Sequence, residues 1–241
     1  MRNDELQVVI LAAGMGTRLG RPLPKPLTPL ADGRSILHQQ LGNLAAAFGD
    51  RVKVTVVVGF RPDQIMAAAP DVRFAFNERY EHTNTSKSLL KALRGTCSGG
   101  VLWLNGDVVF DPELLLEIAP VIARDETFVC VNTAAVGEEE VKYTADVDGY
   151  VHRLSKSVIG GLGEAVGINY IASADKPALV KHLEACDDTD YFERGIETAI
   201  EADGLRVRAL DISSYFVVEV DFAGDLERAN VEVSRTVTSA A

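Results

Sequence analysis

The sequence predicts one α/β domain: a mostly parallel, mixed sheet with helices on both faces and a small antiparallel extension. Three observations predict it. Apolar, strand-like runs alternate with helix-like segments through the first half of the chain. After residue 141 the pattern changes to strand pairs joined by glycine-containing turns. The 241 residues, 47% of them hydrophobic, are enough to bury a proper core.

The elements follow in order from these patterns. Strands in the first half are expected at residues 8–13, 53–59, 72–77, 101–110 and 127–134, and helices at 36–48, 61–69, 86–94 and 113–123. Ser35 is expected to cap the first helix and Gly49 to end it, and Asp111 with Pro112 should start the fourth. The second half adds strand pairs within 143–154 and 163–172, helices at 176–184 and 191–202, and a strand at 216–221 before a final helix.

Charge, cysteine content and hydropathy argue against several classes of partner and site. The net charge is -11, which would repel a nucleic-acid backbone, so no nucleic-acid partner is expected. Cys97, Cys130 and Cys186 are widely spaced and form no CxxC pair, which argues against a disulfide framework or a zinc site. No apolar run has the length of a signal peptide or membrane span. We therefore expect a cytoplasmic protein without a membrane partner; homo-oligomerisation is left open.

A glycine-rich loop follows the first strand and is the first candidate for ligand binding. Gly14, Gly16 and Gly20 suit a phosphate, but the following prolines forbid the helix that a dinucleotide fingerprint requires. These prolines are Pro22, Pro24, Pro26 and Pro29. A Walker loop is excluded because the chain has no Gly-Lys pair. What remains is an irregular loop with Arg18 and Lys25 that suits a nucleoside triphosphate, or a purely structural turn.

The segments "LAAGMGTRL" and "PKPL" resemble the signature of the nucleotidyltransferases that activate sugar 1-phosphates and phosphocholine. The resemblance implies a Rossmann-like (GT-A type) fold, with a nucleotide-binding part at 6–135, an acceptor-binding part at 136–215 and a closing strand and helix at 216–235. It implies that the nucleotide contacts Leu11, Ala12, Ala13, Gly14, Gly16, Thr17, Arg18 and Lys25. The stretch between Arg18 and Lys25 is shorter than in many sugar-activating members.

Two acidic residues stand at strand ends. Asp107 closes the apolar run "LWLNGD", and Asp221 closes "FVVEVD" directly before a helix. Carboxylates at the ends of strands, beside a triphosphate, are what a Mg²⁺ site requires. In the resembled family both positions hold magnesium, so the resemblance assigns the metal to Asp107 and Asp221. Glu219 and Asp225 are neighbouring candidates.

The segment "FNERYEHTNTSKSLLKAL" resembles the bacterial phosphocholine cytidylyltransferase branch of this family. Asn84 and Ser86 within it are expected to contact the nucleotide, while helix capping by Thr85 or Ser86 is the alternative explanation. Further matches, "SKSVIGGLGEAVGINYI" and "YFERGIETAI", extend the resemblance over most of the chain. They imply that Lys156 contacts the acceptor phosphate and that Glu164, Tyr191 and Glu193 lie near the acceptor's other end.

The resulting hypothesis is a Mg²⁺-dependent enzyme that transfers CMP from CTP to a small phosphorylated alcohol and releases pyrophosphate. Arg18 would neutralise the leaving phosphates, Lys25 the reacting phosphate and Lys156 the acceptor. Phosphocholine is the leading acceptor; 2-aminoethylphosphonate, inositol phosphate and sugar 1-phosphates stay open, as do UTP, dTTP and GTP. A non-catalytic nucleotide-sensing domain is the alternative of another class. A glycosyltransferase is disfavoured because the strand end carries one acid rather than a DxD motif.

Overall fold

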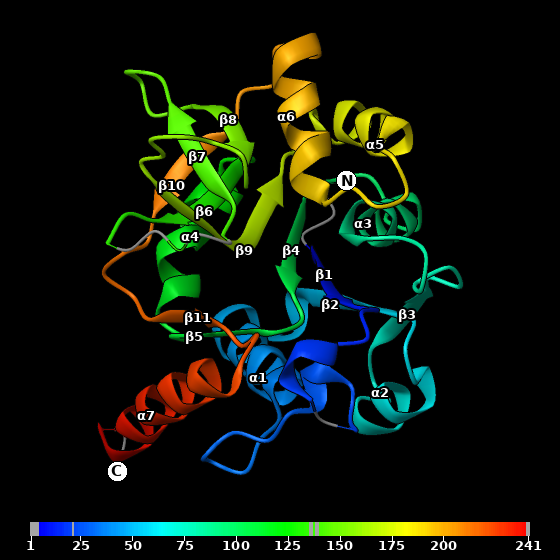
Figure 1. The fold of residues 1–241 in the computed structure, drawn as a ribbon, viewed down its shortest axis with the longest axis vertical. Coiled ribbons are helices and arrows are strands. Elements are labelled where there is room, and N and C mark those ends of the chain that lie inside the picture. Colours follow the sequence, from blue (N-terminus) through cyan, green and yellow to red (C-terminus); the bar gives the residue numbers. More distant parts are fainter. Residues whose placement is uncertain (1–4, 21, 135–136, 138–139, 240–241) are drawn as a thin grey trace.

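The computed structural model describes residues 5–20, 22–134, 137 and 140–239. In this part of the chain the main sheet has nine strands. Seven lie in the order β10-β6-β9-β4-β1-β2-β3, and β7 and β8 extend it beside β9 (Figure 1). These strands are β1 (Leu6–Ala12), β2 (Val52–Val58), β3 (Arg73–Phe76), β4 (Val101–Asn105), β6 (Phe128–Asn132), β7 (Lys142–Ala145), β8 (Val151–Ser155), β9 (Gly163–Ile171) and β10 (Arg208–Asp211).

The sheet is mixed, as expected. β1 pairs in parallel with β2 and β4, β2 with β3, and β6 with β10, whereas β9 runs antiparallel between β4 and β6. Alternate residues of β1 enter two different cores: Val8 and Ile10 pack on one face, Val9 and Leu11 on the other. A strand buried on both faces reads as a continuous apolar run, which is why the sequence revealed it.

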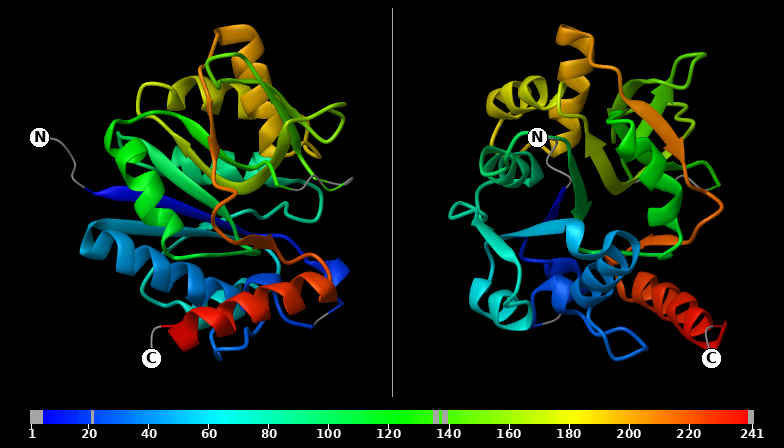
Figure 2. Two further views of the ribbon diagram at one scale, coloured as in Figure 1. Left: turned by 90° about the vertical axis from the view of Figure 1, so that its left-hand side faces the viewer. Right: turned by 180° about the vertical axis from the view of Figure 1, so that it is seen from behind.

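Helices cover both faces of the sheet (Figures 1 and 2). The apolar residues of α1, α2 and α4 join one core cluster, and those of α3, α5 and α6 join the other. A third, smaller cluster joins α7 to the region between β1 and α1. The helices are α1 (Ile36–Phe48), α2 (Pro62–Ala68), α3 (Thr85–Arg94), α4 (Leu114–Ala123), α5 (Lys176–Ala185), α6 (Phe192–Asp203) and α7 (Ala223–Ser239), with 3-10 turns η1 (Thr17–Leu19), η2 (Lys25–Leu27) and η3 (Gly49–Arg51).

One predicted strand is two. The run at 101–110 breaks after Asn105, and its end forms β5 (Val108–Phe110), which pairs antiparallel with β11 (Val217–Glu219) in a separate small sheet. The physical reason is the close approach of Gly106 to β1: its N–H donates to the Leu11 carbonyl at 2.9 Å, and a Cβ there would lie 2.6 Å from that oxygen. The break places Asp107 in a turn between the two sheets.

Helix starts also differ in detail from the expectation. Ser35 caps α1 as predicted, accepting from the His38 N–H. For α3 the capping residue is Asn84, whose side chain accepts from the N–H of Thr85; it is neither Thr85 nor Ser86. Asp111 accepts from the N–H of Glu113, but α4 begins at Leu114, after Pro112 and after the start of the expected range of 113–123.

None of the helices in the described ranges is long and apolar enough to span a bilayer. The three cysteines are free thiols: Cys97 is exposed, Cys186 half-buried and Cys130 buried. Burial raises the pKa of Cys130, so this thiol stays protonated. The predicted boundary between nucleotide and acceptor parts, at residues 135–136, lies outside the described residues.

Candidate active site

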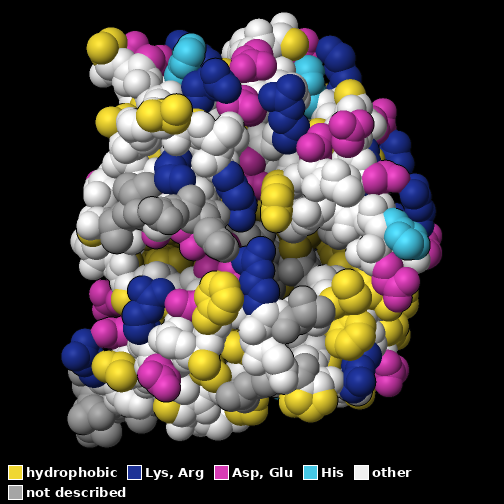
Figure 3. Space-filling model, viewed as in Figure 1, with side chains coloured by type: hydrophobic (Ala, Val, Ile, Leu, Met, Phe, Trp, Pro, Cys, Tyr) yellow, Lys and Arg dark blue, Asp and Glu magenta, His cyan; other side chains and the backbone are white. Residues whose placement is uncertain are grey.

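A cleft of about 610 Å³ opens at the carboxyl ends of β1 and β4. The glycine loop after β1 lines one side, β11 and the start of α7 line another, and the β8–β9 segment with the start of α6 lines the far end. Figure 3 shows a hollow in the middle of this face, with Lys and Arg side chains around it and acidic side chains inside. In sheets of this kind ligands bind at this edge.

The glycine loop is held against the cleft by Gly16. Its φ of 59° is in the left-handed region, and a Cβ there would lie 2.8 Å from the Lys25 Cβ. Gly16 therefore permits both the turn and the close approach of the basic residue. Of the other predicted nucleotide contacts, Leu11, Ala12, Gly14, Arg18 and Lys25 line the cleft.

Two nucleotide contacts from the same loop are not seen at the cleft. Ala13 is buried and its carbonyl accepts from the N–H of Phe60, so it serves the β1–β2 connection. Thr17 begins η1, and its side chain lies outside the described part of the structure.

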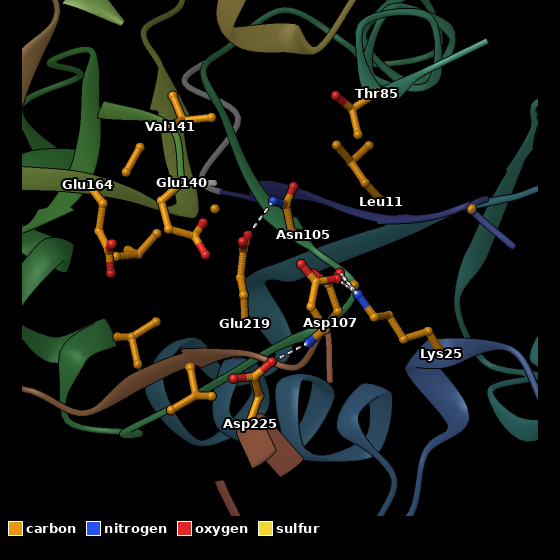
Figure 4. A pocket seen from close by; sticks show the side chains of 18 of the residues that line it. Leu11, Lys25, Thr85, Asn105, Asp107, Glu140, Val141, Glu164, Glu219 and Asp225 are labelled. Carbon is orange, nitrogen blue, oxygen red and sulfur yellow. Dashed lines mark hydrogen bonds and ion pairs between the residues drawn. The ribbon is translucent and has the colours of Figure 1, made fainter. Parts of the chain in front are cut away.

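Lys25 joins the two predicted metal ligands. Its Nζ lies 2.7 Å from Asp107 Oδ2 and 2.5 Å from Asp221 Oδ1 (Figure 4 labels Lys25 and Asp107). Burial works against the charged ammonium, but the two ion pairs outweigh it and raise the pKa of Lys25. The structure thus brings together a carboxylate that precedes β5 and one that follows β11, with a cation between them.

Asp225 holds the backbone of Asp221 in place at the start of α7. The Oδ2 atom of Asp225 accepts hydrogen bonds from the N–H groups of Asp221 and Phe222, at 3.0 and 2.7 Å. Burial opposes ionisation of Asp225, but these donors and Arg228 hold its pKa below the ordinary value. Arg18 reaches the same region, with its guanidinium 3.3 Å from Asp221 Oδ2.

Behind this pair lies a buried acid. Glu219 Oε1 accepts from Asn105 Nδ2 at 2.7 Å, and burial, with the charge of Asp107, raises the Glu219 pKa well above its ordinary value. Gly167 on β9 leaves room for this contact, since a Cβ there would lie 2.6 Å from Asn105 Nδ2. Asp107 Oδ1 is buried and accepts no hydrogen bond from any residue in the described ranges.

The four predicted acceptor residues all line the far end of the cleft. Lys156 follows β8 directly, and its Nζ lies 5.0 Å from the centroid of the Tyr191 ring. Glu164 accepts from the N–H of Gly137 at 2.9 Å. Glu193, in the first turn of α6, is only 7% exposed, and burial raises its pKa to about 7.

In the segment at 76–93, the residue that lines the cleft is not one of the two expected to contact the nucleotide. Thr85 lines it, whereas Asn84 caps α3 and Ser86 is fully buried. The structure therefore gives Asn84 and Ser86 a place in the helix start and does not bring them to the cleft.

Sequence reasoning missed Glu140 and Asn105. Glu140 lines the acceptor end, where burial and the Glu164 charge raise its pKa; nothing in the acidic run "GEEE" marks one residue as inward-facing. Asn105 could have been found, because it is a polar residue ending an apolar buried strand, the same signal that identified Asp107. Figure 4 shows these side chains around the cleft.

Comparison with known proteins decides the family. Residues 8–190 match the model of the MobA-like NTP transferase domain. The chain belongs to this family. The expectation of a nucleotidyltransferase with an α/β, Rossmann-like fold is thereby confirmed at the level of the family.

Individual relatives agree in fold and differ in substrate. A CMP-5'-(3-aminopropyl)phosphonate synthase of Streptomyces rubellomurinus is 30% identical over 250 residues, covering 95% of this chain. The chain spans 39% of that relative's length. The CTP:phosphocholine cytidylyltransferase of Streptococcus pneumoniae has a TM-score of 0.76 at 18% identity, covering 95% of this nucleotidyltransferase and 99% of that chain. The inositol-1-phosphate CTP transferase of T. maritima has a TM-score of 0.75 at 15% identity, covering 92% and 91%. At these identities the solved structures show the fold alone.

Proposed function

We propose that this nucleotidyltransferase is a Mg²⁺-dependent cytidylyltransferase that transfers CMP from CTP to a small phosphate or phosphonate acceptor. The observation that carries the proposal is the convergence of the glycine loop, Lys25, Asp107 and Asp221 in one cleft. The choice of CTP is supported by the sequence resemblance and by the CMP-linked product named for the Streptomyces relative.

The two aspartates fit a magnesium ion. One atom, Lys25 Nζ, already reaches both carboxylates, and Asp107 Oδ1 is buried with no partner in the described residues. No group of three or more His, Cys, Asp or Glu in that part is arranged to hold a metal. Mg²⁺ needs only one or two carboxylates, because substrate phosphates and water complete its shell. Bound there, it would neutralise and polarise the phosphates of the nucleotide.

The charges of the cleft support a cation requirement. Among the described residues, seven carboxyl groups line it against four Lys or Arg side chains, so added positive charge would favour binding of an anionic substrate. The carboxylates are Asp107, Glu140, Glu164, Glu193, Glu219, Asp221 and Asp225, and the cations are Arg18, Lys25, Lys156 and Arg228. We propose that Mg²⁺ supplies this positive charge beside the glycine loop, and that a positive group of the acceptor supplies it at the far end, near Glu193.

The chain's own residues then have separable tasks. Backbone N–H groups around Gly14 and Gly16 bind the triphosphate, and Arg18 neutralises the leaving phosphates. Lys25 stabilises charge on the reacting phosphate, and Lys156 orients the acceptor. An acceptor phosphate oxygen forms the new bond to the α-phosphorus as the bond to the β-phosphate breaks and pyrophosphate leaves. A phosphomonoester acceptor needs no general base, because its second pKa of ~6 leaves it mostly ionised at neutral pH.

A substrate panel tests the proposal. Purified protein with Mg²⁺ is given each of CTP, UTP, dTTP and GTP with phosphocholine, aminoalkylphosphonates, inositol phosphate and sugar 1-phosphates, and pyrophosphate release is measured. We expect release with CTP and an amine-bearing acceptor. The absence of pyrophosphate release with every combination of nucleotide and acceptor would overturn the proposal. CTP binding by calorimetry without turnover would instead favour a nucleotide-sensing domain.

A further inference from the structure

One carboxylate oxygen at the acceptor end has no partner among the described residues. Glu193 Oε2 is buried and makes no hydrogen bond with any of them, although the side chain lines the cleft and the carboxylate has a backbone hydrogen bond. A buried polar atom without a donor is costly, so proteins seldom keep one without a reason. The adjacent α6 residue Phe192 is already fixed by packing edge-to-face on Trp103. Glu193 is thus held at the wall of the cleft, with one oxygen that no described residue satisfies.

The surroundings of Glu193 favour one charge for a ligand at this oxygen. Glu140 and Glu164 line the same cleft, and the positive charge of Lys156 acts on Glu193. Burial of Glu193 raises its pKa to about 7, although the Lys156 charge acts in the opposite direction. A ligand group that donates a hydrogen bond to Glu193 Oε2 would satisfy this oxygen, and a positive charge on that group would favour the ionised carboxylate.

Aromatic faces are scarce there. A quaternary ammonium has no N–H and is bound mainly by aromatic rings. Lys156 Nζ lies over the Tyr191 ring, and the Phe192 ring is 1% exposed and packed on Trp103. The other aromatic residue lining the cleft, Phe222, follows Asp221 at the opposite end. Among the residues that the structure describes, the acceptor end therefore offers one ring at most.

We propose that the acceptor carries a primary ammonium group that donates a hydrogen bond to Glu193, an inference that rests on the proposed function. The preferred acceptors are ω-aminoalkylphosphonates or phosphate esters of primary amino alcohols. Phosphocholine, the leading candidate from the sequence, is a poorer acceptor, since its trimethylammonium group cannot satisfy the carboxylate oxygen. Lys156 and Glu193 would then bind the two oppositely charged ends of one small zwitterion.

Turnover with matched acceptors tests this. We expect kcat/KM for 3-aminopropylphosphonate, 2-aminoethylphosphonate or phosphoethanolamine to exceed that for phosphocholine by at least about tenfold, the value of one hydrogen bond to a charged group. Glu193→Gln should lower kcat/KM for these amines by about 10- to 100-fold, mainly through KM. Propylphosphonate, which lacks the amine, should be affected less than about threefold. Glu201→Gln, on the exposed face of the same helix, is the matched control.

Acceptor binding separates this inference from the proposed function. Calorimetry with Mg²⁺ and a non-hydrolysable CTP analogue measures binding without turnover. Preference for phosphocholine, or equal losses for propylphosphonate and the amines in Glu193→Gln, would overturn the inference while leaving the cytidylyltransferase proposal intact. Amine-selective binding that depends on Glu193, with no pyrophosphate release from any acceptor, would support the inference and sink the proposed function.

Discussion

Replacing Glu193 by glutamine is expected to make the ligand-free protein more stable at alkaline pH. The side chain is buried with an unpartnered oxygen, and its pKa rises from an ordinary 4.5 to about 7. Between these values the folded state holds a proton that the unfolded state has released, so this group's contribution to stability falls as pH rises. Glutamine has the same shape and does not titrate, which removes this pH dependence.

The magnitude follows from the two pKa values. The interval from 4.5 to about 7, at about 1.4 kcal/mol per pH unit, corresponds to about 3 kcal/mol at pH 8. Near pH 4 both states carry the protonated acid, and the difference between variant and parent should approach zero. For a chain of this size, about 3 kcal/mol corresponds to an increase in Tm of roughly 6 to 12 °C.

Urea unfolding of both proteins at several pH values between 4 and 8, without ligand, measures the difference directly. Other titrating groups are common to both proteins and cancel in the comparison. A parent protein more stable than Glu193→Gln at pH 8, or a difference that does not change with pH, would refute the reasoning. Together with the expected loss of amine acceptors, a gain in stability would mark Glu193 as a residue kept for binding at a cost to the fold.

Three further changes test other parts of the site and fold. Asp107→Asn should lower turnover by at least about 100-fold with an unchanged circular dichroism spectrum; normal turnover would remove Asp107 from the metal site. Gly16→Ala should cost about 1 kcal/mol or more and raise the KM for CTP, because its φ is 59° and a Cβ meets Lys25. Gly14→Ala, whose Cβ meets nothing within 4 Å, is the stability control, and equal stability losses would count against the loop geometry. Ser35→Ala should lower the free energy of unfolding, measured in urea, by about 1 kcal/mol, because the α1 cap is lost. The kcat should not change, and a lower kcat would contradict a purely structural role for Ser35.

Much of the fold and part of the site could be predicted because their signals are local. The apolar run of β1, the glycine loop and the polar residues ending buried strands are readable within a few residues. Asp107 and Asp221 were chosen in this way, and the structure brings both to Lys25. Their role as metal ligands stays a prediction.

Two features that sequence reasoning missed are not marked by the local sequence pattern. The break after Asn105 requires the close approach of Gly106 to the Leu11 carbonyl, and no pattern within residues 101–110 marks it. The side chain of Asn84 competes with those of Thr85 and Ser86 for the same helix start, and backbone geometry decides among three good capping residues. Local propensity alone cannot rank such alternatives.

The small sheet of β5 and β11 has a consequence for the order in which the molecule is made. Chains emerge from the ribosome N-terminus first, and the parallel core around β1, β2 and β4 can form early. Asp107 emerges with that core, but Asp221 reaches it only when β11 has paired with β5. The nascent chain therefore holds its glycine loop and Lys25 without their second carboxylate until nearly the whole described sequence has been synthesised. Assembly of the Lys25–Asp107–Asp221 cluster is coupled to the synthesis of β11.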